Sequence, residues 1–320
     1  YKSYALKLGV SPKEIAKILQ KYREYGEAST QREQNSCQTK IDLRNKVLGD
    51  VRDLDTIGWC YAFSTADLLS YKLGQKISAA DFAINYNNDF INNFLKKYNN
   101  KGEQDFKGGY TTMINGVLQK MKQKGGACLE SKFSSEDNGG GALRANLTLL
   151  DNLKRQQWSP KTLRCQGVFE KVFPQLPIKD VIDIAERSTR SEFIQMLSEK
   201  ACQPRINLGA LEIINSPLTA STKDLYDTID QQLESKNIVK ISYNAGLLFN
   251  THYTGRNRPH NSVVLGRRFN QKNGECEYLI RNSYGRGCKA YDTTLAANCE
   301  EGNVWMPKSI LAKGVEDVSY

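Results

Sequence analysis

The chain of 320 residues contains only two histidines, His252 and His260, so a general base of the imidazole kind must be one of these two. His260 follows Pro259 and precedes the apolar run 263–265, which is typical of a buried strand. A histidine at the mouth of such a strand is held rigidly and can face a cleft. His252 lies in the polar segment FNTHYTG and lacks such an anchor. We therefore expect His260 to be the base, although a histidine taken alone is more often structural.

Cys60 lies in the segment GWCYAFS, where a helix is predicted to begin. A helix N-terminus carries partial positive charge and N–H groups without intrahelical partners. Both features stabilise a thiolate, so we expect a lowered thiol pKa and a nucleophilic Cys60. A buried structural cysteine or half of a disulfide is an equal alternative on position alone.

Asn282 lies in the segment RNSYG, directly after an apolar run that predicts a strand. Its side-chain oxygen could accept the second N–H of an imidazole and so set the tautomer and orientation of the ring. For a lone asparagine at a strand end, an ordinary turn is the better interpretation. The three residues together indicate thiol nucleophilic catalysis, with a thiolate, a base and a group that orients the base.

The elements that must position these residues follow a simple order. A helix is predicted over 60–73, ended by Gly74, and helical patterns recur at 79–98, 111–124, 178–199 and 222–236. Strand-like runs come late, at 238–243, 262–269, 277–281 and 303–306. Helices followed by strands predict an α+β fold in which the two kinds of structure are segregated.

The N-terminus is predicted to be separate from this domain. Residues 11–25 form an amphipathic helical pattern in which Ser11 and Glu14 can make a capping box, and residues 27–40 are polar. We therefore divide the chain into an N-terminal helical extension and linker, 1–40, and a main domain, 41–320. The extension is interpreted as a helix packed on the back of the domain, with a remnant of an inhibitory segment as the alternative.

Composition limits the classes of function. The formal net charge is +10, but the basic residues are spread out and no nucleic-acid motif is present, so nucleic acid is not an expected partner. No run approaches the 18 or more apolar residues of a membrane helix, so no membrane span is expected. Metal and organic cofactors are not expected either, because thiol chemistry needs neither and no cysteine pair has C-x-x-C spacing.

The eight cysteines bear on the cellular compartment. With Cys60 set aside, three disulfides and one free thiol are possible, and Cys288 and Cys299 look like a local pair. Such a set fits a secreted, periplasmic or lysosome-like compartment, although a fully reduced protein is the alternative. Because the chain starts at Tyr1, we expect that a targeting segment has been removed.

Four separate segments resemble the papain family of cysteine proteases. Residues 57–64, IGWCYAFS, resemble the family's CGSCWAFS, and residues 259–266, PHNSVVLG, resemble its histidine segment. Residues 281–285, RNSYG, resemble its KNSWG, and residues 107–110, KGGY, resemble its glycine pair. Asp42-Leu43-Arg44 also echoes the Asp-x-Arg entry to the family's domain. The segments occur in the family's order, and the resemblance spans roughly residues 41 to 320.

The resemblance implies a two-lobed fold, with a helical lobe that carries Cys60 and a strand-rich lobe that carries His260 and Asn282. It implies an endopeptidase in which the Cys60 thiolate attacks a peptide carbonyl, His260 acts as acid and base, and Asn282 orients His260. Tyr284 would shield that contact from water where the family has tryptophan. The backbone of Gly108 and Gly109 would bind the extended peptide or protein substrate. We expect a monomer.

Three departures from the family pattern are visible. His260 follows Cys60 by 200 residues, whereas the compact family has about 130–150, so we place a helical insertion at approximately 134–220 and expect a cap near the cleft. Ile57 and about Phe106 occupy the positions of a bracing disulfide, so an apolar contact is expected there.

The third departure concerns Leu54, which stands at the position of the family's oxyanion-hole glutamine. Leucine cannot donate a hydrogen bond, and loss of one oxyanion donor costs about 10²–10³ in rate. Asp53 and Asp55 flank it with negative charge. Gln38 and nearby amide side chains are candidate substitutes. The alternative hypothesis is therefore a catalytically impaired protein that binds peptide or protein in its cleft.

Overall fold

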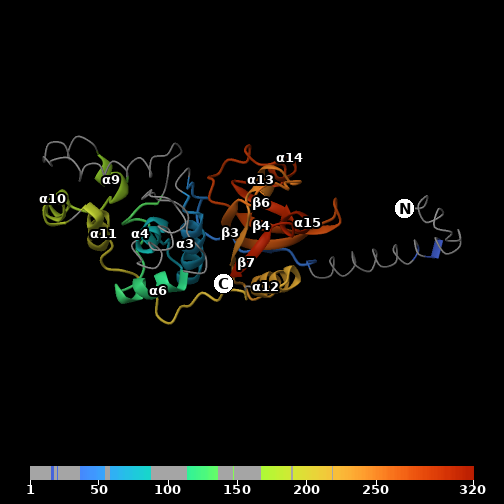
Figure 1. The fold of residues 1–320 in the computed structure, drawn as a ribbon, viewed down its shortest axis with the longest axis horizontal. Helices are drawn as coiled ribbons and strands as arrows, with labels where there is room; N and C mark the ends of the chain where they lie inside the picture. Colours follow the sequence, from blue (N-terminus) through green and yellow to red (C-terminus); the bar gives the residue numbers. More distant parts are fainter. Residues whose placement is uncertain are drawn as a thin grey trace.

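The computed structural model describes residues 16–17, 20, 37–54, 58–87, 114–135, 147, 167–188, 190–217 and 219–320. Helices come first along this part of the chain and strands follow, and the helical part lies beside an antiparallel sheet (Figure 1). The predicted α+β class, with a helical lobe and a strand-rich lobe, is confirmed. The longer helices are α3 (Cys60–Leu73), α4 (Ala79–Asn87), α6 (Ile114–Gln123), α10 (Ile178–Arg187), α11 (Arg190–Ala201) and α12 (Thr222–Glu234).

The sheet is built from the C-terminal half of the chain and from one early strand. Its order is β5-β6-β4-β3-β2-β7, with β1 paired to β3, and every pair is antiparallel. The strands are β1 (Ile41–Asp42), β2 (Val239–Asn244), β3 (Pro259–Asn270), β4 (Glu275–Arg281), β5 (Cys299–Glu300), β6 (Asn303–Pro307) and β7 (Val315–Ser319). The short helices α9 (Val168–Val172), α13 (Gly246–Phe249), α14 (Thr293–Ala296) and α15 (Lys308–Leu311) complete the described elements.

Local sequence accounts for several element ends. Helix α3 has the predicted bounds, and Gly74 ends it with φ 67°, a left-handed conformation that glycine adopts without steric cost. Helix α12 begins with a capping box between Ser221 and Asp224. The helical pattern at 178–199 forms two helices rather than one, because Ser188 takes extended dihedrals, φ −92° and ψ 150°. Strand β3 begins three residues before its predicted start and so includes His260.

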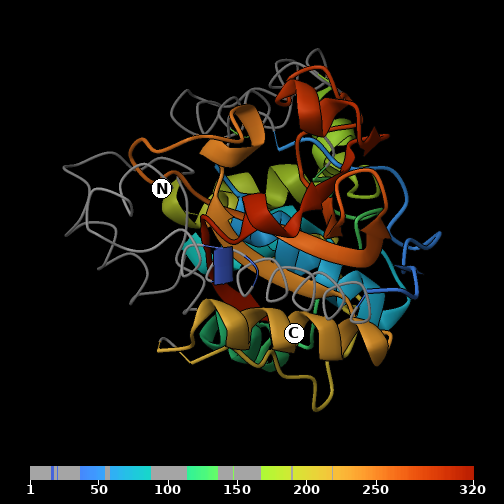
Figure 2. The same ribbon diagram turned by 90° about the vertical axis from the view of Figure 1, so that its right-hand side faces the viewer.

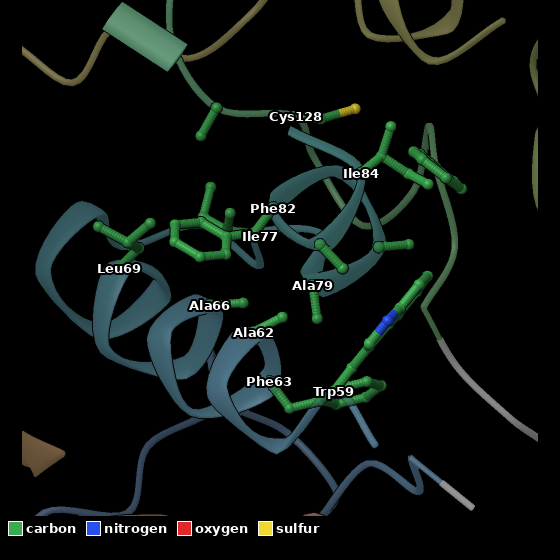
Figure 3. Packing of buried hydrophobic residues seen from close by; sticks show 14 of the residues in the cluster. Trp59, Ala62, Phe63, Ala66, Leu69, Ile77, Ala79, Phe82, Ile84 and Cys128 are labelled. Carbon is green, nitrogen blue, oxygen red and sulfur yellow. The ribbon is translucent and has the colours of Figure 1, made fainter. Parts of the chain in front are cut away.

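Two hydrophobic cores lie on opposite faces of the sheet. One is formed mainly by α3 and α4, where Trp59, Phe63 and Phe82 pack closely (Figure 3), and the sheet contributes Val263 and Leu265 to it. The other lies between the sheet and α12, which runs along one side of it (Figure 2). Helix α3 packs on β3 and β2. Side chains of β2 and β3 that point toward α3 therefore lie under the start of that helix.

The described residues contain three disulfides. Cys37–Cys276 and Cys128–Cys202 join segments that are distant in the sequence, and Cys288–Cys299 closes a short loop. The predicted local pair is confirmed. Cys60 is the free cysteine among the described residues. Cys165, the remaining cysteine, lies outside them.

The described helices of the segment 134–220 lie at one end of the molecule (Figure 1). Helix α11 packs on α4, and α3 lies between α4 and the sheet. The buried ion pair between Arg205 and Asp81 joins this segment to α4. Helix α10 packs in turn on α11. The expected cap beside the cleft stays a prediction.

Most of the predicted N-terminal extension lies outside the described residues, and residues 16, 17 and 20, which are described, are helical. The division at residue 40 stays a prediction. Among the described helices, none combines the length and apolar character that crossing a bilayer requires.

Candidate active site

Three separate elements bring Cys60, His260 and Asn282 to one place. Cys60 is the first residue of α3, His260 is the second residue of β3, and Asn282 directly follows β4. Strands β3 and β4 are antiparallel neighbours, so the start of one lies beside the end of the other. Pro259 at the start of β3 is compatible with the sheet because a first residue need not donate a ladder hydrogen bond. The packing of α3 on β3 then places the helix start against the same corner.

The His260 imidazole is tied to Asn282. Its Nε2 atom lies 2.6 Å from Asn282 Oδ1, and His260 is buried. Asn282 is fully buried, and its Nδ2 donates to the Tyr291 hydroxyl at 3.1 Å. The Ser262 hydroxyl donates to Asn282 Oδ1 at 3.3 Å. The amide is therefore oriented with its oxygen toward the ring, so Nε2 carries the proton and Nδ1 faces the rest of the site.

The Cys60 thiol and the imidazole form a coupled pair. Burial raises the pKa of Cys60, but the His260 charge, a hydrogen bond with His260 and the N–H groups of Asn261 together lower that pKa to about 7. Burial lowers the pKa of His260, whereas the Cys60 charge and hydrogen bonds to Cys60 and Asn282 outweigh burial and raise it. The two shifts have opposite signs and one cause, since a thiolate and an imidazolium stabilise each other. This arrangement can supply a nucleophile near neutral pH.

Tyr284 covers the imidazole. Its ring centroid lies 4.9 Å from that of His260, and its hydroxyl lies 3.4 Å from His260 Nδ1. Phe249, at the end of α13, stacks on the Tyr284 ring, with the two ring centroids 6.0 Å apart. The aromatic layer limits access of water to the ring. Tyr284 thus packs against the His260 ring, and its role as a shield of the His260–Asn282 contact stays a prediction.

Leu54 lies in a segment that pairs with the residues after Asn282, and its side chain brings no hydrogen-bond donor. Its side chain is buried in the helical core, and its backbone N–H donates to the Ser283 carbonyl at 2.9 Å. Asp53 next to it forms an isolated bridge with Tyr284. The segment therefore runs beside the active site, but the leucine side chain cannot bind an oxyanion.

Gln38, the suggested substitute for the missing amide, lies at the wrong end of the sheet. It follows Cys37, whose disulfide partner Cys276 is near the start of β4, whereas Asn282 follows the end of that strand. Six residues of strand separate the two ends by roughly 20 Å. Gln38 is therefore not near Cys60.

Asn261 is a site residue that sequence reasoning missed. Its Nδ2 donates to Cys60 Sγ at 3.8 Å, and its Oδ1 accepts from the Ser242 hydroxyl at 3.1 Å. The Ser242 contact holds the amide so that its N–H groups face the sulfur. The available signal was its place directly after His260, but sequence alone could not show that this side chain faces α3.

Other predicted residues are not part of the described site. Gly108 and Gly109 lie outside the described residues, as do Asp55, Ile57 and Phe106. His252 is exposed in the loop after α13, as its lack of an anchor predicted.

Comparisons with known proteins find cysteine proteases among solved structures. The proform of Amb a 11, a ragweed pollen allergen, is 15% identical with a TM-score of 0.46, covering 88% of this chain and 64% of its own. The digestive procathepsin L 3 of Tenebrio molitor larval midgut is 14% identical, with a TM-score of 0.44 and coverage of 88% and 68%. The bromelain protease from Ananas comosus, in complex with the inhibitor E64, is 13% identical, with a TM-score of 0.43 and coverage of 88% and 97%.

This chain thus spans less than two thirds of the Amb a 11 chain. No protein-family model and no curated protein matches the chain.

Proposed function

We propose that the chain is a thiol-dependent endopeptidase that cleaves peptide bonds in peptide or protein substrates. The observation that carries this proposal is the single arrangement of Cys60, His260 and Asn282. A thiol with a pKa near 7 lies at the start of α3, contacts an imidazole, and that imidazole is bound by a buried amide at 2.6 Å. This is the geometry of an activated nucleophile, a base and an orienting group.

The chemical roles follow from these contacts. The Cys60 thiolate attacks the peptide carbonyl carbon, and the carbonyl π electrons move to the oxygen. When the C–N bond breaks, the imidazolium of His260 gives its proton to the leaving amine, and an acyl-enzyme with a thioester bond remains. Neutral His260 then takes a proton from water, the hydroxide attacks the thioester, and the thiolate is restored as the acid leaves. Asn282 keeps the ring in place through both steps.

The oxyanion formed in the attack needs hydrogen-bond donors, and Leu54 supplies none. The backbone N–H of Cys60 at the helix start is one available donor. We assign the side-chain amide of Asn261, whose nitrogen lies 3.8 Å from the Cys60 sulfur, as the second donor to the oxyanion. Its orientation by Ser242 means that little reorganisation is required during the reaction.

One observation favours a second candidate function. Leu54 is buried at the position from which a donor would be expected, and an oxyanion hole with a missing donor slows turnover by about 10²–10³. A chain with this site could bind peptides in its cleft and retain a reactive thiol without useful turnover. The two functions differ in turnover and not in thiol reactivity.

The compartment and assembly remain part of the proposal. Three disulfides favour an oxidising compartment, such as the extracellular space or a lysosome-like compartment. We also propose that the chain acts as a monomer, with residues 41–320 as the catalytic domain.

The experiment uses a mixed pool of fluorogenic peptides across pH 5 to 8, under conditions that keep Cys60 reduced. Wild type is compared with Cys60→Ala and His260→Ala, and His252→Ala serves as the matched control because it removes the other histidine from an exposed loop. The assay is repeated after removal of residues 1–36, because an extension that covers a cleft would suppress turnover, and this cut keeps Cys37 and its disulfide with Cys276.

Turnover that is lost in Cys60→Ala and His260→Ala but kept in His252→Ala is the expected result. The Asn261→Ala variant should then lower kcat by about tenfold or more while KM changes little, since its amide acts on the transition state. Absence of turnover in both forms of the wild type, with Cys60 still alkylated near neutral pH, would overturn the peptidase and favour the binding function.

A further inference from the structure

Lys240 is a fully buried lysine in the middle of the sheet. It lies on β2 with an exposed fraction of 0%, and its register partners are Val263 on β3 and Ser319 on β7. Its Nζ atom has no hydrogen-bond partner among the described residues. An unpaired buried ammonium costs several kcal/mol relative to water, so its presence in a core needs a physical reason.

The side chain of Lys240 belongs to the face of the sheet that α3 covers. Its neighbours Val239 and Ile241 belong to the core on the α12 side, and side chains alternate along a strand. Lys240 therefore shares its face with Ser242, two residues along β2 and about 7 Å away. Ser242 holds Asn261, and Asn261 contacts Cys60 Sγ. A polar row thus runs under the start of α3, from Lys240 to the thiol.

Two negatively charged groups act on the Lys240 ammonium. Burial lowers the pKa of Lys240 to about 8, and the negative charges of Asp317 and of the Cys60 thiolate both oppose this change. Asp317 comes from β7, where it pairs with Ser242, and it accepts a hydrogen bond from Ser216 at 3.0 Å. The lysine is therefore mainly charged near pH 7, and the partly buried Asp317 carboxylate and the Cys60 thiolate are the negative charges that favour its charged form.

Other titratable groups near Cys60 do not take this role. Burial raises the pKa of Tyr61, Tyr243 and Tyr284, so these side chains stay neutral in the range where the thiol titrates. His260, at the start of β3, is the cation whose charge lowers the pKa of the thiol. Lys240 lies on a different element, in the middle of β2, and the Cys60 charge raises its pKa.

We propose that Lys240 is a positioning residue of the active site, whose buried ammonium acts as a second counter-ion that holds Cys60 in its thiolate form. This inference rests on the proposed role of Cys60 as the reacting thiolate. Electrostatic coupling is reciprocal, so a thiolate that favours the protonated lysine is favoured by it to the same extent. Because the low-dielectric interior screens little, the coupling acts even without a direct hydrogen bond.

The first test measures alkylation of Cys60 by iodoacetamide from pH 5 to 9, read at the Cys60 peptide by mass spectrometry. Lys240→Met keeps the shape of the side chain without its charge. Lys272→Met is the matched control, because it removes the same charge from an exposed position in the β3–β4 turn. Thermal unfolding shows that each variant is folded.

Loss of a nearby opposite charge changes a pKa by about one or more, so Lys240→Met should react about tenfold more slowly at pH 6 and equally fast at pH 9. Lys272→Met should follow the wild-type profile, because exposed charges are screened over this distance. Superimposed profiles for wild type and Lys240→Met would overturn the proposal.

The second test leaves Lys240 in place and so does not depend on the folding of its variants. With ¹³C-labelled lysine, the titration of Lys240 is followed by NMR in the wild type and in Cys60→Ala. The midpoint should fall when the thiolate is absent, and an unchanged midpoint would overturn the proposal. Neither test uses peptide turnover, so a chain that binds without cleaving would sink the proposed function and leave the role of Lys240 to be decided by these two titrations.

Discussion

His260 Nε2 lies 2.6 Å from Asn282 Oδ1, across two neighbouring antiparallel strands. The contact is buried, and the amide is held on its other side by the Tyr291 hydroxyl. It determines which imidazole nitrogen faces Cys60. The reactivity proposed for Cys60 therefore depends on the Asn282 amide, although the hydrogen bonds described for this amide go to His260, Ser262 and Tyr291 and not to the sulfur.

Asn282→Ala should lower kcat for peptide cleavage by about 10²-fold, the lower range of what a positioned acid–base group contributes. The reason is that the ring loses the acceptor that selects its tautomer and orientation. Steady-state kinetics with the best peptide of the pool is the measurement. Tyr291→Phe is the control, since it removes the partner of the amide nitrogen and keeps the contact with the ring. Equal kinetics for Asn282→Ala and wild type would mean that the ring is held by other contacts.

Tyr284 contacts His260 in two ways, because its ring covers the imidazole and its hydroxyl lies near His260 Nδ1. Two variants distinguish these roles. Tyr284→Phe keeps the ring over His260 and should change kcat less than about threefold, because a 3.4 Å contact is at the weak end of hydrogen-bond distances. Tyr284→Ala exposes the His260–Asn282 contact to water and should lower kcat about tenfold or more, since water weakens electrostatic interactions. Kinetics of the two variants side by side decides between the roles, and a larger loss in the phenylalanine variant would assign the role to the hydroxyl.

Leu54→Gln restores an amide donor beside the site. If turnover is limited by an incomplete oxyanion hole, kcat should rise by about 10–100-fold with little change in KM. Leu54→Met is the control, since it conserves volume and adds no donor. An unchanged kcat in a folded Leu54→Gln variant would indicate that Asn261 and the Cys60 backbone already complete the hole.

Lys240→Met should increase the free energy of unfolding at pH 7, on the order of 2 kcal/mol, because the native lysine is charged without a hydrogen bond. The pKa of Lys240 is lowered to about 8 in the folded chain, while the unfolded side chain keeps its proton to about 10.4. Between these values the unfolded state binds more protons, so wild-type stability rises with pH.

The advantage of Lys240→Met should therefore shrink above pH 8 and vanish near about pH 10. Urea unfolding at pH 7, 9 and 10 checks this expectation, with Lys272→Met as the variant of equal charge change. A constant difference between Lys240→Met and wild type across these pH values would show that packing and not charge is responsible.

Local features of the sequence predicted the parts of the fold that depend on neighbouring residues. The helix at 60–73 and its end at Gly74 follow from apolar spacing and from the left-handed conformation that glycine permits. Alternation and β-branched residues predicted the late strands, although β3 begins earlier than expected because pairing with β2 extends it to Pro259. The helical pattern at 178–199 concealed a break at Ser188, since a polar residue does not by itself interrupt an amphipathic pattern.

By itself the sequence determined the types and order of the reactive residues, the helix that begins at Cys60 and the class of fold. Tertiary structure alone decided that Asn261 contacts the sulfur, that Gln38 lies at the far end of the sheet, and that Lys240 lies under α3. Strand register and helix-on-sheet packing bring these residues together from distant segments, and a shift of one residue would turn each side chain to the other face. Such registers arise from the sum of core contacts along the whole chain, so no local pattern specifies them.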